Sequence, residues 1–300
     1  MNLENYRFSV DSLQQEERAE YTFAGCTTLV SKLCGCLLAF AMFPAFAVEQ
    51  NQAERIVSIN QCADEFLLNI VPKDKLLSVT HFVKDPNLSW DADLAFDIPG
   101  NAARAEEVMS YDPDLVFAGD FTSRSTVGLL RSLGVEVVEL AHPNSIAEVI
   151  GLINLVGEAT GYQHEAQKLI DTLVIQNGAK ESTITAAVYQ PNGYTTGKHT
   201  LIDDVLSTAG VVNMAALQGL ASYAQYPMER LIVDQPDLLI LDPQVHAKPS
   251  LGHEFLTHPA LESTFGSARI VEVPPQAWAC GTHHVFAAVQ LIRDAAADLE

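Results

Sequence analysis

Short apolar runs alternate with stretches of mixed polar and apolar residues over residues 55–140. The runs have the length and continuous apolar character of buried parallel strands, and the stretches between them have helical spacing. Pro72 and Gly134 close two of the helical stretches. Strands that alternate with helices in this way indicate a parallel α/β sheet. The pattern predicts strands over 55–59, 76–80, 115–118 and 135–140, and helices over 64–70, 105–110 and 126–133.

The same order of elements returns after residue 184. Strands are predicted over 184–189, 238–241 and 269–273, and helices over 201–208 and 228–233. A local repeat supports this: Glu106 is followed by PDLV at 113–116, and Glu229 is followed at the same offset by PDLL at 236–239. The chain is therefore predicted to contain two copies of one lobe.

A long helical segment separates the two lobes. Ser145 and Glu148 have the spacing of a capping box, and apolar residues follow at helical intervals. Gly157 and Gly161 are expected to interrupt the helix before it continues. The predicted fold class is α/β, with two parallel-sheet lobes joined by a single long helix and a ligand cleft between the lobes. We expect the N-terminal lobe over 48–143, the interlobe helix over 144–180 and the C-terminal lobe over 181–300.

The longest apolar run, residues 33–48, lies near the N-terminus. It is short for a bilayer span and ends in a small-x-small sequence at Ala45 and Ala47, which is typical of a secretory signal. We expect a leader over 1–47, with the signal peptide at about 30–47 and cleavage after Ala47. An anchored N-terminal helix is the alternative. Acidic residues in 1–31 suit a signal poorly, so translation is expected to start near Leu29 or Val30.

Acidic residues outnumber basic ones by 38 to 17, which gives a formal net charge of −21. Nucleic-acid binding relies on an excess of lysine and arginine, so this balance excludes it as a function. Hydrophobic residues make up 48% of the chain, which is enough for a sizeable core and excludes a disordered chain.

The carboxyl ends of the parallel strands are expected to meet at one crevice, where such sheets bind ligands. Loops at these ends hold several scarce cations, including Lys248, together with aromatic side chains. A locally basic, aromatic-lined cleft would suit a bulky, partly anionic ligand. The candidate ligand-binding residues are Asn60, Lys84, Phe121, Arg124, Tyr194, Lys198, His246, Trp278 and His283.

Two cysteines remain once the leader is removed, and both lie in predicted cleft loops of opposite lobes. In an oxidising compartment, Cys62 and Cys280 either form an interlobe disulfide or stay buried as small apolar residues. Both alternatives stay open at this point.

The motifs of common catalytic sites are missing. Residues 193–199 lack the spacing and the serine or threonine of a phosphate-binding loop, and no nucleophile elbow or dinucleotide fingerprint is present. We expect a binding protein and not an enzyme, with a hydrolase assembled from distant Ser, His and Asp residues as one alternative. A receptor for free metal ions is another. The adjacent His283 and His284 are expected to point to different faces, which disfavours chelation by both.

Four segments together resemble the periplasmic substrate-binding proteins of ABC importers for iron complexes and cobalamin. They read RIVSINQCADEFLL at 55–68, AEEVMSYDPDLVFAG at 105–119, YQPNGYTTGKHTLIDDVLSTAG at 189–210 and WACGTHHVFAAVQLI at 278–292. The resemblance covers 54–297 and implies a periplasmic monomer that works with an inner-membrane permease and its ATPase. In this family a glutamate on each lobe docks onto permease arginines, and the matching residues are Glu106 and Glu229.

The resemblance implies no intrinsic cofactor and a metal complex as the ligand. A ferric siderophore ranks first, held by Arg124, Lys84, Lys198 or Lys248. Cobalamin ranks second, with Trp278 and Phe121 as aromatic walls. Haem ranks third and requires an axial ligand, for which the candidates are Tyr194, His246 and His283.

Overall fold

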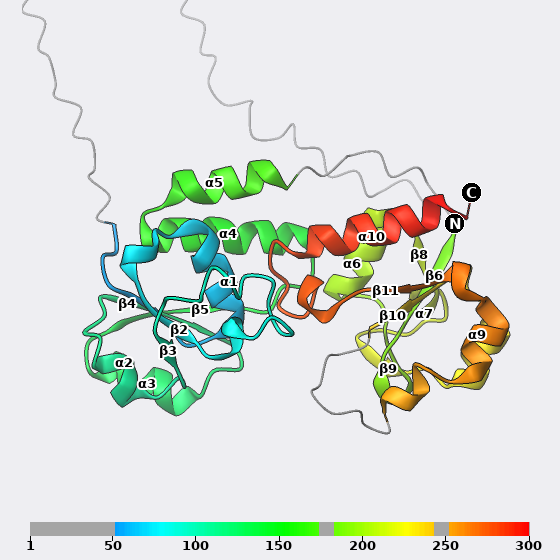
Figure 1. The fold of residues 1–300 in the computed structure, drawn as a ribbon, viewed down its shortest axis with the longest axis horizontal. Helices are drawn as coiled ribbons and strands as arrows, with labels where there is room; N and C mark the ends of the chain where they lie inside the picture. Colours follow the sequence, from blue (N-terminus) through cyan, green and yellow to red (C-terminus); the bar gives the residue numbers. More distant parts are fainter. Residues whose placement is uncertain (1–51, 174–182, 243–251, 300) are drawn as a thin grey trace, which may run out of the picture. The chain divides into compact units, whose positions relative to one another are not determined.

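The computed structural model describes residues 52–173, 183–242 and 252–299, and the two lobes within these ranges belong to one compact unit (Figure 1). The predicted leader over 1–47 lies outside the described residues. So do residues 174–180 of the predicted interlobe helix and the two candidates His246 and Lys248.

The N-terminal lobe is built on a five-stranded sheet in the order β3-β2-β1-β4-β5. All of its strand pairs are parallel, and Ile56 lies beside Leu76 on one side and Leu115 on the other. The expected parallel α/β lobe is confirmed. The strands are β1 (Ile56–Ser58), β2 (Leu76–Thr80), β3 (Gly100–Asn101), β4 (Leu115–Gly119) and β5 (Glu136–Leu140).

Helices on both faces of this sheet enclose two hydrophobic cores. They are α1 (Gln61–Ile70), α2 (Ala105–Met109) and α3 (Arg124–Ser132). Successive strand side chains point to opposite faces. Ile56 therefore joins the core beneath α1 with Phe66, whereas Val57 joins the core beneath α2 and α3 with Val108 and Leu130.

The C-terminal lobe repeats this plan with a parallel sheet in the order β11-β10-β6-β8, so the predicted two-lobed fold class is confirmed. The lobe also has an antiparallel pair of short strands, β7 and β9, which the hydrophobic pattern did not predict. The strands are β6 (Thr185–Tyr189), β7 (Tyr194–Thr196), β8 (Val212–Asn213), β9 (Tyr223–Gln225), β10 (Leu238–Leu241) and β11 (Ile270–Glu272); the helices are α6 (Leu201–Ala209), α7 (Met214–Leu217), α8 (Met228–Asp234), α9 (Pro259–Phe265) and α10 (Val285–Ala297).

The sequence repeat has a structural counterpart in each lobe. The Asp114 carboxylate accepts hydrogen bonds from the backbone N–H groups of Glu54 and Arg55, just before β1. Asp237 likewise accepts from the backbone N–H and the hydroxyl of Thr185 at 2.8 Å each, at the start of β6. Asp114 precedes β4 and anchors the neighbouring β1. Asp237 precedes β10 and anchors the neighbouring β6 in the same way.

Helix α4 (Ile146–Thr160) joins the two lobes. Its start lies against the C-terminal lobe, where the Ile146 N–H donates to Asp204 Oδ2 at 2.7 Å. Its end lies against the N-terminal lobe, where the Ala53 N–H donates to the Thr160 carbonyl at 3.0 Å. The Ser145 hydroxyl caps the helix by accepting from the Glu148 N–H.

The helix continues through Gly157 and ends at Gly161, whose φ of 79° ends the regular backbone, so the expected interruption at Gly157 is wrong. Helix α5 (Gln163–Thr172) then runs back alongside α4 (Figure 1). A Cβ at Gly157 would lie 2.5 Å from the Cβ of Ala166. The glycine therefore allows the two helices to pack closely.

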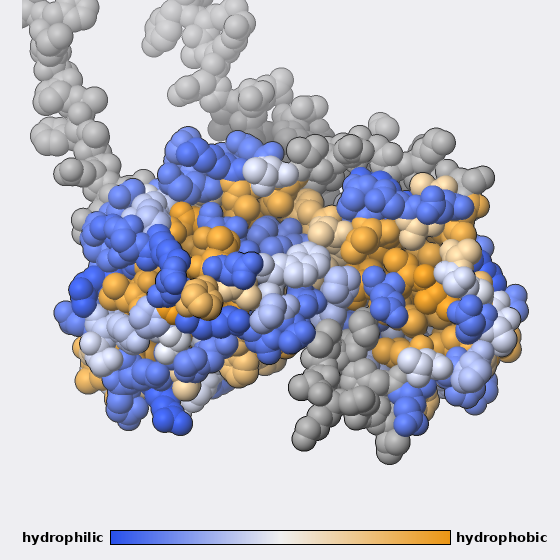
Figure 2. Space-filling model, in the orientation of Figure 1, coloured by the Kyte–Doolittle hydropathy of each residue, from blue (hydrophilic) through white to orange (hydrophobic). Residues whose placement is uncertain are grey.

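Hydrophilic residues cover the outer sides of α5 and α10, while apolar side chains gather between α10 and α9 in the C-terminal lobe (Figure 2). Within the described residues, no helix has the length and apolar character needed to cross a membrane.

Candidate functional site

A pocket of about 510 Å³ lies between the lobes, and this is a typical size for a small-molecule site. Both lobes contribute: α1 and the loop at 87–88 come from the N-terminal side, and β7, α6 and β9 come from the C-terminal side. The segment 275–280 forms a further wall. The lining residues are Gln61, Cys62, Asn87, Leu88, His142, Asn144, Gln190, Thr196, Thr200, Leu201, Ile202, Tyr223, Asp242, Pro275, Trp278, Ala279 and Cys280.

The lining is mainly neutral. Amide and hydroxyl side chains alternate with apolar ones, and no lysine or arginine is present among the described lining residues. The one carboxylate, Asp242, is buried and accepts a hydrogen bond from Gln190 Nε2 at 2.8 Å. Burial and the charge of Asp242 together raise the pKa of the nearby Tyr223. The pocket therefore has a slight negative character.

Two polar groups of the lining have no hydrogen-bond partner among the described residues. They are the indole Nε1–H of Trp278 and the hydroxyl of Thr196, and both are buried. Leaving a buried donor unpaired costs about 1–3 kcal/mol. Neither atom is open to solvent in this structure, so a ligand reaches them only after the lining moves.

Two helices begin at this pocket. Asn60 caps α1 by accepting from the Ala63 N–H at 3.1 Å, and Thr200 caps α6 by accepting from the Asp203 N–H at 3.1 Å. The first turns of these helices contribute Gln61, Cys62, Leu201 and Ile202 to the lining. Helix N-termini favour acceptor atoms of a ligand without adding a full charge.

A disulfide joins Cys62 on α1 to Cys280 on the segment after β11, with the two Cα atoms 5.0 Å apart. Of the two alternatives for these cysteines, the structure has the disulfide. It holds the Trp278 wall of the pocket against α1, and both cysteines line the pocket. Gln276 Nε2 also donates to the Asn87 carbonyl at 2.8 Å, so the segment is fixed at a second point.

A smaller hollow of about 30 Å³ adjoins the pocket and shares Cys62, His142 and Cys280 with it. Of the predicted ligand-binding residues, it contains Asn60 and Phe121. Phe121 is 89% exposed. The two hollows together follow the carboxyl ends of β1, β4 and β5, where the sequence predicted a crevice.

The predicted cations lie outside the pocket lining. Lys84 donates to the Phe96 carbonyl, Arg124 is an exposed residue at the start of α3, and Lys198 borders a separate hollow next to α7. The expectation that these three side chains line the cleft is therefore wrong. Lys198 shows how local this is, since its neighbours Thr196 and Thr200 line the pocket while Lys198 itself borders the other hollow.

Of the remaining predicted site residues, one lines the pocket and two lie outside it. Trp278 lines the pocket and is only 4% exposed. Tyr194 pairs with Gln225 in the β7–β9 ladder and does not belong to the lining. His283 lies outside it too, in a cluster of ionisable side chains beside α1.

This cluster begins with two buried carboxyl groups on α1. Burial raises the pKa of Asp64 to about 7, although hydrogen bonds from Thr80 lower it. Burial also raises the pKa of Glu65 to about 7, against the opposing effects of His284 and a 2.8 Å hydrogen bond from the Thr282 hydroxyl.

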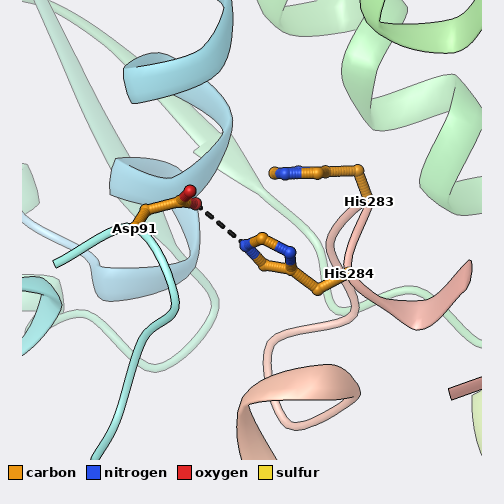
Figure 3. Close-up of side chains that lie close together, drawn as sticks. All are labelled: Asp91, His283 and His284. Atoms are coloured by element: carbon orange, nitrogen blue, oxygen red, sulfur yellow. Dashed lines mark hydrogen bonds and ion pairs between the residues drawn. The ribbon is translucent and has the colours of Figure 1, made fainter. Parts of the chain in front are cut away.

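Asp91, His283 and His284 complete the cluster (Figure 3). His284 Nε2 lies 2.9 Å from Asp91 Oδ2, and the ring centroids of the two histidines are 4.0 Å apart. Both imidazoles extend from one turn before α10 toward Asp91 (Figure 3). The expectation that the adjacent histidines point to different faces is wrong, because they lie in this turn and not in a regular helix or strand.

A family model described as periplasmic binding protein matches residues 56–268 of the chain. The chain belongs to the periplasmic binding protein family. The predicted family resemblance is thereby confirmed.

Two proteins with similar sequences carry different descriptions. A cobalamin-binding protein of Halobacterium salinarum is 28% identical over 200 residues, which are 63% of this chain and 54% of that protein. The chain therefore spans about half the length of that relative. The uncharacterized ABC transporter substrate-binding lipoprotein YvrC of Bacillus subtilis is 27% identical over 214 residues, covering 66% of this chain and 67% of that one.

A solved structure shares the fold of this periplasmic binding protein. The heme-binding protein RhuT of Roseiflexus sp. RS-1, in its apo form, superimposes with a TM-score of 0.63 and 21% identity over 82% of this chain and 98% of that one. Proteins described with different ligands thus resemble this chain, so the ligand has to be argued from the pocket itself.

The two glutamates of the repeat occupy matching places in this family member. Glu106 lies in the first turn of α2 and Glu229 in the first turn of α8, and both are exposed. One acidic side chain is therefore available on each lobe.

Several lining residues escaped the sequence analysis because it looked for cations and aromatic rings. Gln61, Asn87, Asn144 and Thr200 are common polar residues whose role depends on where the chain places them. A signal was present for some of them: Asn144 precedes the capping box, and Thr200 has the spacing of an N-cap before 201–208.

Proposed function

We propose that this chain is the substrate-binding component of an ABC importer, and that its ligand is a corrinoid of the cobalamin type. The neutral pocket lining is the observation that carries the proposal. A corrinoid carries amide side chains around an apolar macrocycle, so it offers hydrogen-bonding groups to amides and hydroxyls and a flat face to an indole.

The unpaired Trp278 Nε1–H and Thr196 hydroxyl support this choice, since a movement of the lining that opens these buried atoms would let amide groups of a ligand pair with them. Catecholate and carboxylate siderophores are anionic, and they need cations that the described lining lacks. This reverses the order expected from the sequence, where a ferric siderophore ranked first. The relative described as a cobalamin-binding protein agrees with the corrinoid.

Haem is the second candidate, because His142 borders both hollows and an imidazole is a common axial ligand. The propionates of haem would have no lysine or arginine partner in the described lining, which places haem below a corrinoid.

Titration of the purified protein with cyanocobalamin, haemin and a ferric catecholate complex tests the ligand. We expect one cyanocobalamin per chain, with quenching of tryptophan fluorescence and a rise in melting temperature. Binding of the ferric complex without cyanocobalamin would refute the corrinoid assignment. Binding of none of the three would refute the proposed function as a whole.

The partners that follow from this function are a membrane permease and its ATPase, reached in the periplasm after removal of the leader behind Ala47. Glu106 and Glu229 are proposed to dock onto basic permease side chains, because one exposed carboxylate on each lobe suits charge-assisted hydrogen bonds. The Glu106→Ala/Glu229→Ala variant should lose uptake in cells and keep its ligand affinity. Normal uptake by this variant would refute the docking role.

A further inference from the structure

The cluster of Asp91, His283 and His284 brings together three metal-binding side chains from two distant parts of the sequence (Figure 3). Asp91 lies on a loop of the N-terminal lobe, and the histidines precede α10. One potential ligand atom from each residue lies within 4.8 Å of the other two. A metal with bonds of about 2.0–2.2 Å brings its ligand atoms within about 4.4 Å of one another, so small side-chain movements are sufficient.

A simple ion pair explains only part of this arrangement. It accounts for Asp91 and His284, which lie 2.9 Å apart, but leaves His283 without a role. His283 Nδ1 is buried and has no hydrogen-bond partner among the described residues. An imidazole in this position, beside a second imidazole and a carboxylate, has a free lone pair for a metal ion.

The charges around the cluster also favour a cation. Glu65 and Asp91 are both buried, at 1% and 6% exposure. Buried carboxyl groups of this kind are stabilised by a bound metal ion.

We infer that Asp91, His283 and His284 bind a single divalent transition-metal ion. Two imidazoles and one carboxylate form a donor set that suits Zn²⁺ and related first-row ions, whereas Mg²⁺ and Ca²⁺ prefer oxygen ligands alone. Three protein ligands leave a fourth position for water. The inference concerns the protein itself and does not depend on which ligand the pocket takes.

Neighbouring side chains already orient the proposed ligands. Asn69 Nδ2 donates to Asp91 Oδ2 at 3.1 Å, and Trp90 lies edge-on to His284 with ring centroids 5.3 Å apart. Such contacts fix the direction of metal ligands and increase metal affinity. An ion here would tie the loop around Asp91 to the segment that carries Trp278 and the disulfide, a few residues from the pocket wall.

Zn²⁺ titration of the full chain tests this inference. The protein is stripped with EDTA, any thiol outside the Cys62–Cys280 disulfide is alkylated without reduction, and Zn²⁺ is added against a coloured chelator. We expect one tight Zn²⁺ per chain, a higher melting temperature with Zn²⁺ and no effect of Mg²⁺. Co²⁺ in the same site should give a visible absorption spectrum that reports nitrogen ligands.

The His283→Ala and Asp91→Asn variants should each lose at least about tenfold in Zn²⁺ affinity and lose the Co²⁺ spectrum. His164→Ala, on the exposed surface of α5, is the matched control and should bind like the wild type. Circular dichroism verifies folding, and either folded variant suffices for the test. Absence of stoichiometric Zn²⁺ binding by the wild type, or unchanged binding by a folded variant, would overturn the inference.

Discussion

The ligand pocket and the ionisable cluster are made from the same three stretches of chain, yet their chemistry is opposite. Helix α1, the loop at 87–91 and the segment 275–284 each contribute to both regions. The pocket receives amide, indole and disulfide groups from these stretches, and the cluster receives carboxyl and imidazole groups. The residues involved are Gln61, Cys62, Asn87, Trp278 and Cys280 in the pocket, and Glu65, Asp91, Thr282, His283 and His284 in the cluster.

The difference separates two tasks. An unpaired neutral group such as the Trp278 Nε1–H gains a hydrogen bond from a ligand at little electrostatic cost. The cluster instead pairs buried ionisable groups across the sequence, as in the 2.9 Å contact between His284 Nε2 and Asp91 Oδ2. Removing one member of such a pair is costly, so the cluster and the disulfide hold the segment 275–284 in place.

Loss of the disulfide should have the largest effect, because it lies where the two regions meet. The Cys62→Ser/Cys280→Ser variant removes a cross-link between residues 218 positions apart in the sequence. Its free energy of unfolding should be lower than that of the wild type by about 4 kcal/mol. Urea denaturation measures the loss. A reductant should lower the stability of the wild type and leave the double variant unchanged; equal stability of both proteins would show that the cluster alone fixes the segment.

Trp278→Ala should weaken ligand binding and leave the cluster intact. Loss of the indole face and its N–H should cost about 2 kcal/mol, or about thirtyfold in Kd for cyanocobalamin. Phe96→Ala is the control, since that ring is 77% exposed and lies outside the pocket. Isothermal titration compares the two variants. A similar loss in both would mean that the indole does not contact the ligand.

Asp64→Asn should change stability in a pH-dependent way without affecting ligand affinity. Burial raises the pKa of Asp64 from 3.8 to about 7, so the folded state retains a proton that the unfolded chain has released. The contribution of this group is present below pH 3.8 and is lost as the pH rises to about 7. The unfolding free energy of the wild type should therefore fall relative to the variant by about 1 kcal/mol per pH unit over this range.

Denaturant titrations at several pH values measure this slope. The exposed Asp93→Asn substitution is the control and should follow the wild type at every pH. Parallel curves for the wild type and Asp64→Asn would contradict a raised pKa at Asp64.

Ionic strength should have the smallest effect. Because the described pocket lining holds no lysine or arginine, the Kd for cyanocobalamin should change less than about twofold between about 0.05 and 0.5 M salt. Equilibrium dialysis measures it. A steep loss of affinity with salt would indicate cationic contacts and would remove the contrast between the two regions.

Much of the fold follows from hydrophobic pattern. The strands at 76–80 and 238–241 were predicted to the residue, because continuous apolar runs between turn residues are specific for buried parallel strands. Helix α1 begins three residues earlier than predicted, since Asn60 is its cap and not part of a longer loop. The β7–β9 pair escaped prediction because its three-residue strands are stabilised by tertiary contacts, which leave no periodic signal.

The candidate site was less predictable. Position at strand ends identified Trp278 and, in the smaller hollow, Asn60 and Phe121. It failed for Lys84 and Arg124, because the direction in which a loop turns depends on packing that one sequence does not encode locally. The turn that brings His283 and His284 together is a similar case.

The central claim is that a neutral pocket selects a neutral, amide-rich ligand. The most direct test compares a corrinoid amide, such as cobinamide, with cobyrinic acid, which has the same macrocycle but carboxylates in place of the amides. Isothermal titration at neutral pH should show that the amide form binds on the order of 100-fold more tightly, because the carboxylates would find no cation in the described lining. Equal or tighter binding of the acid form would contradict the claim.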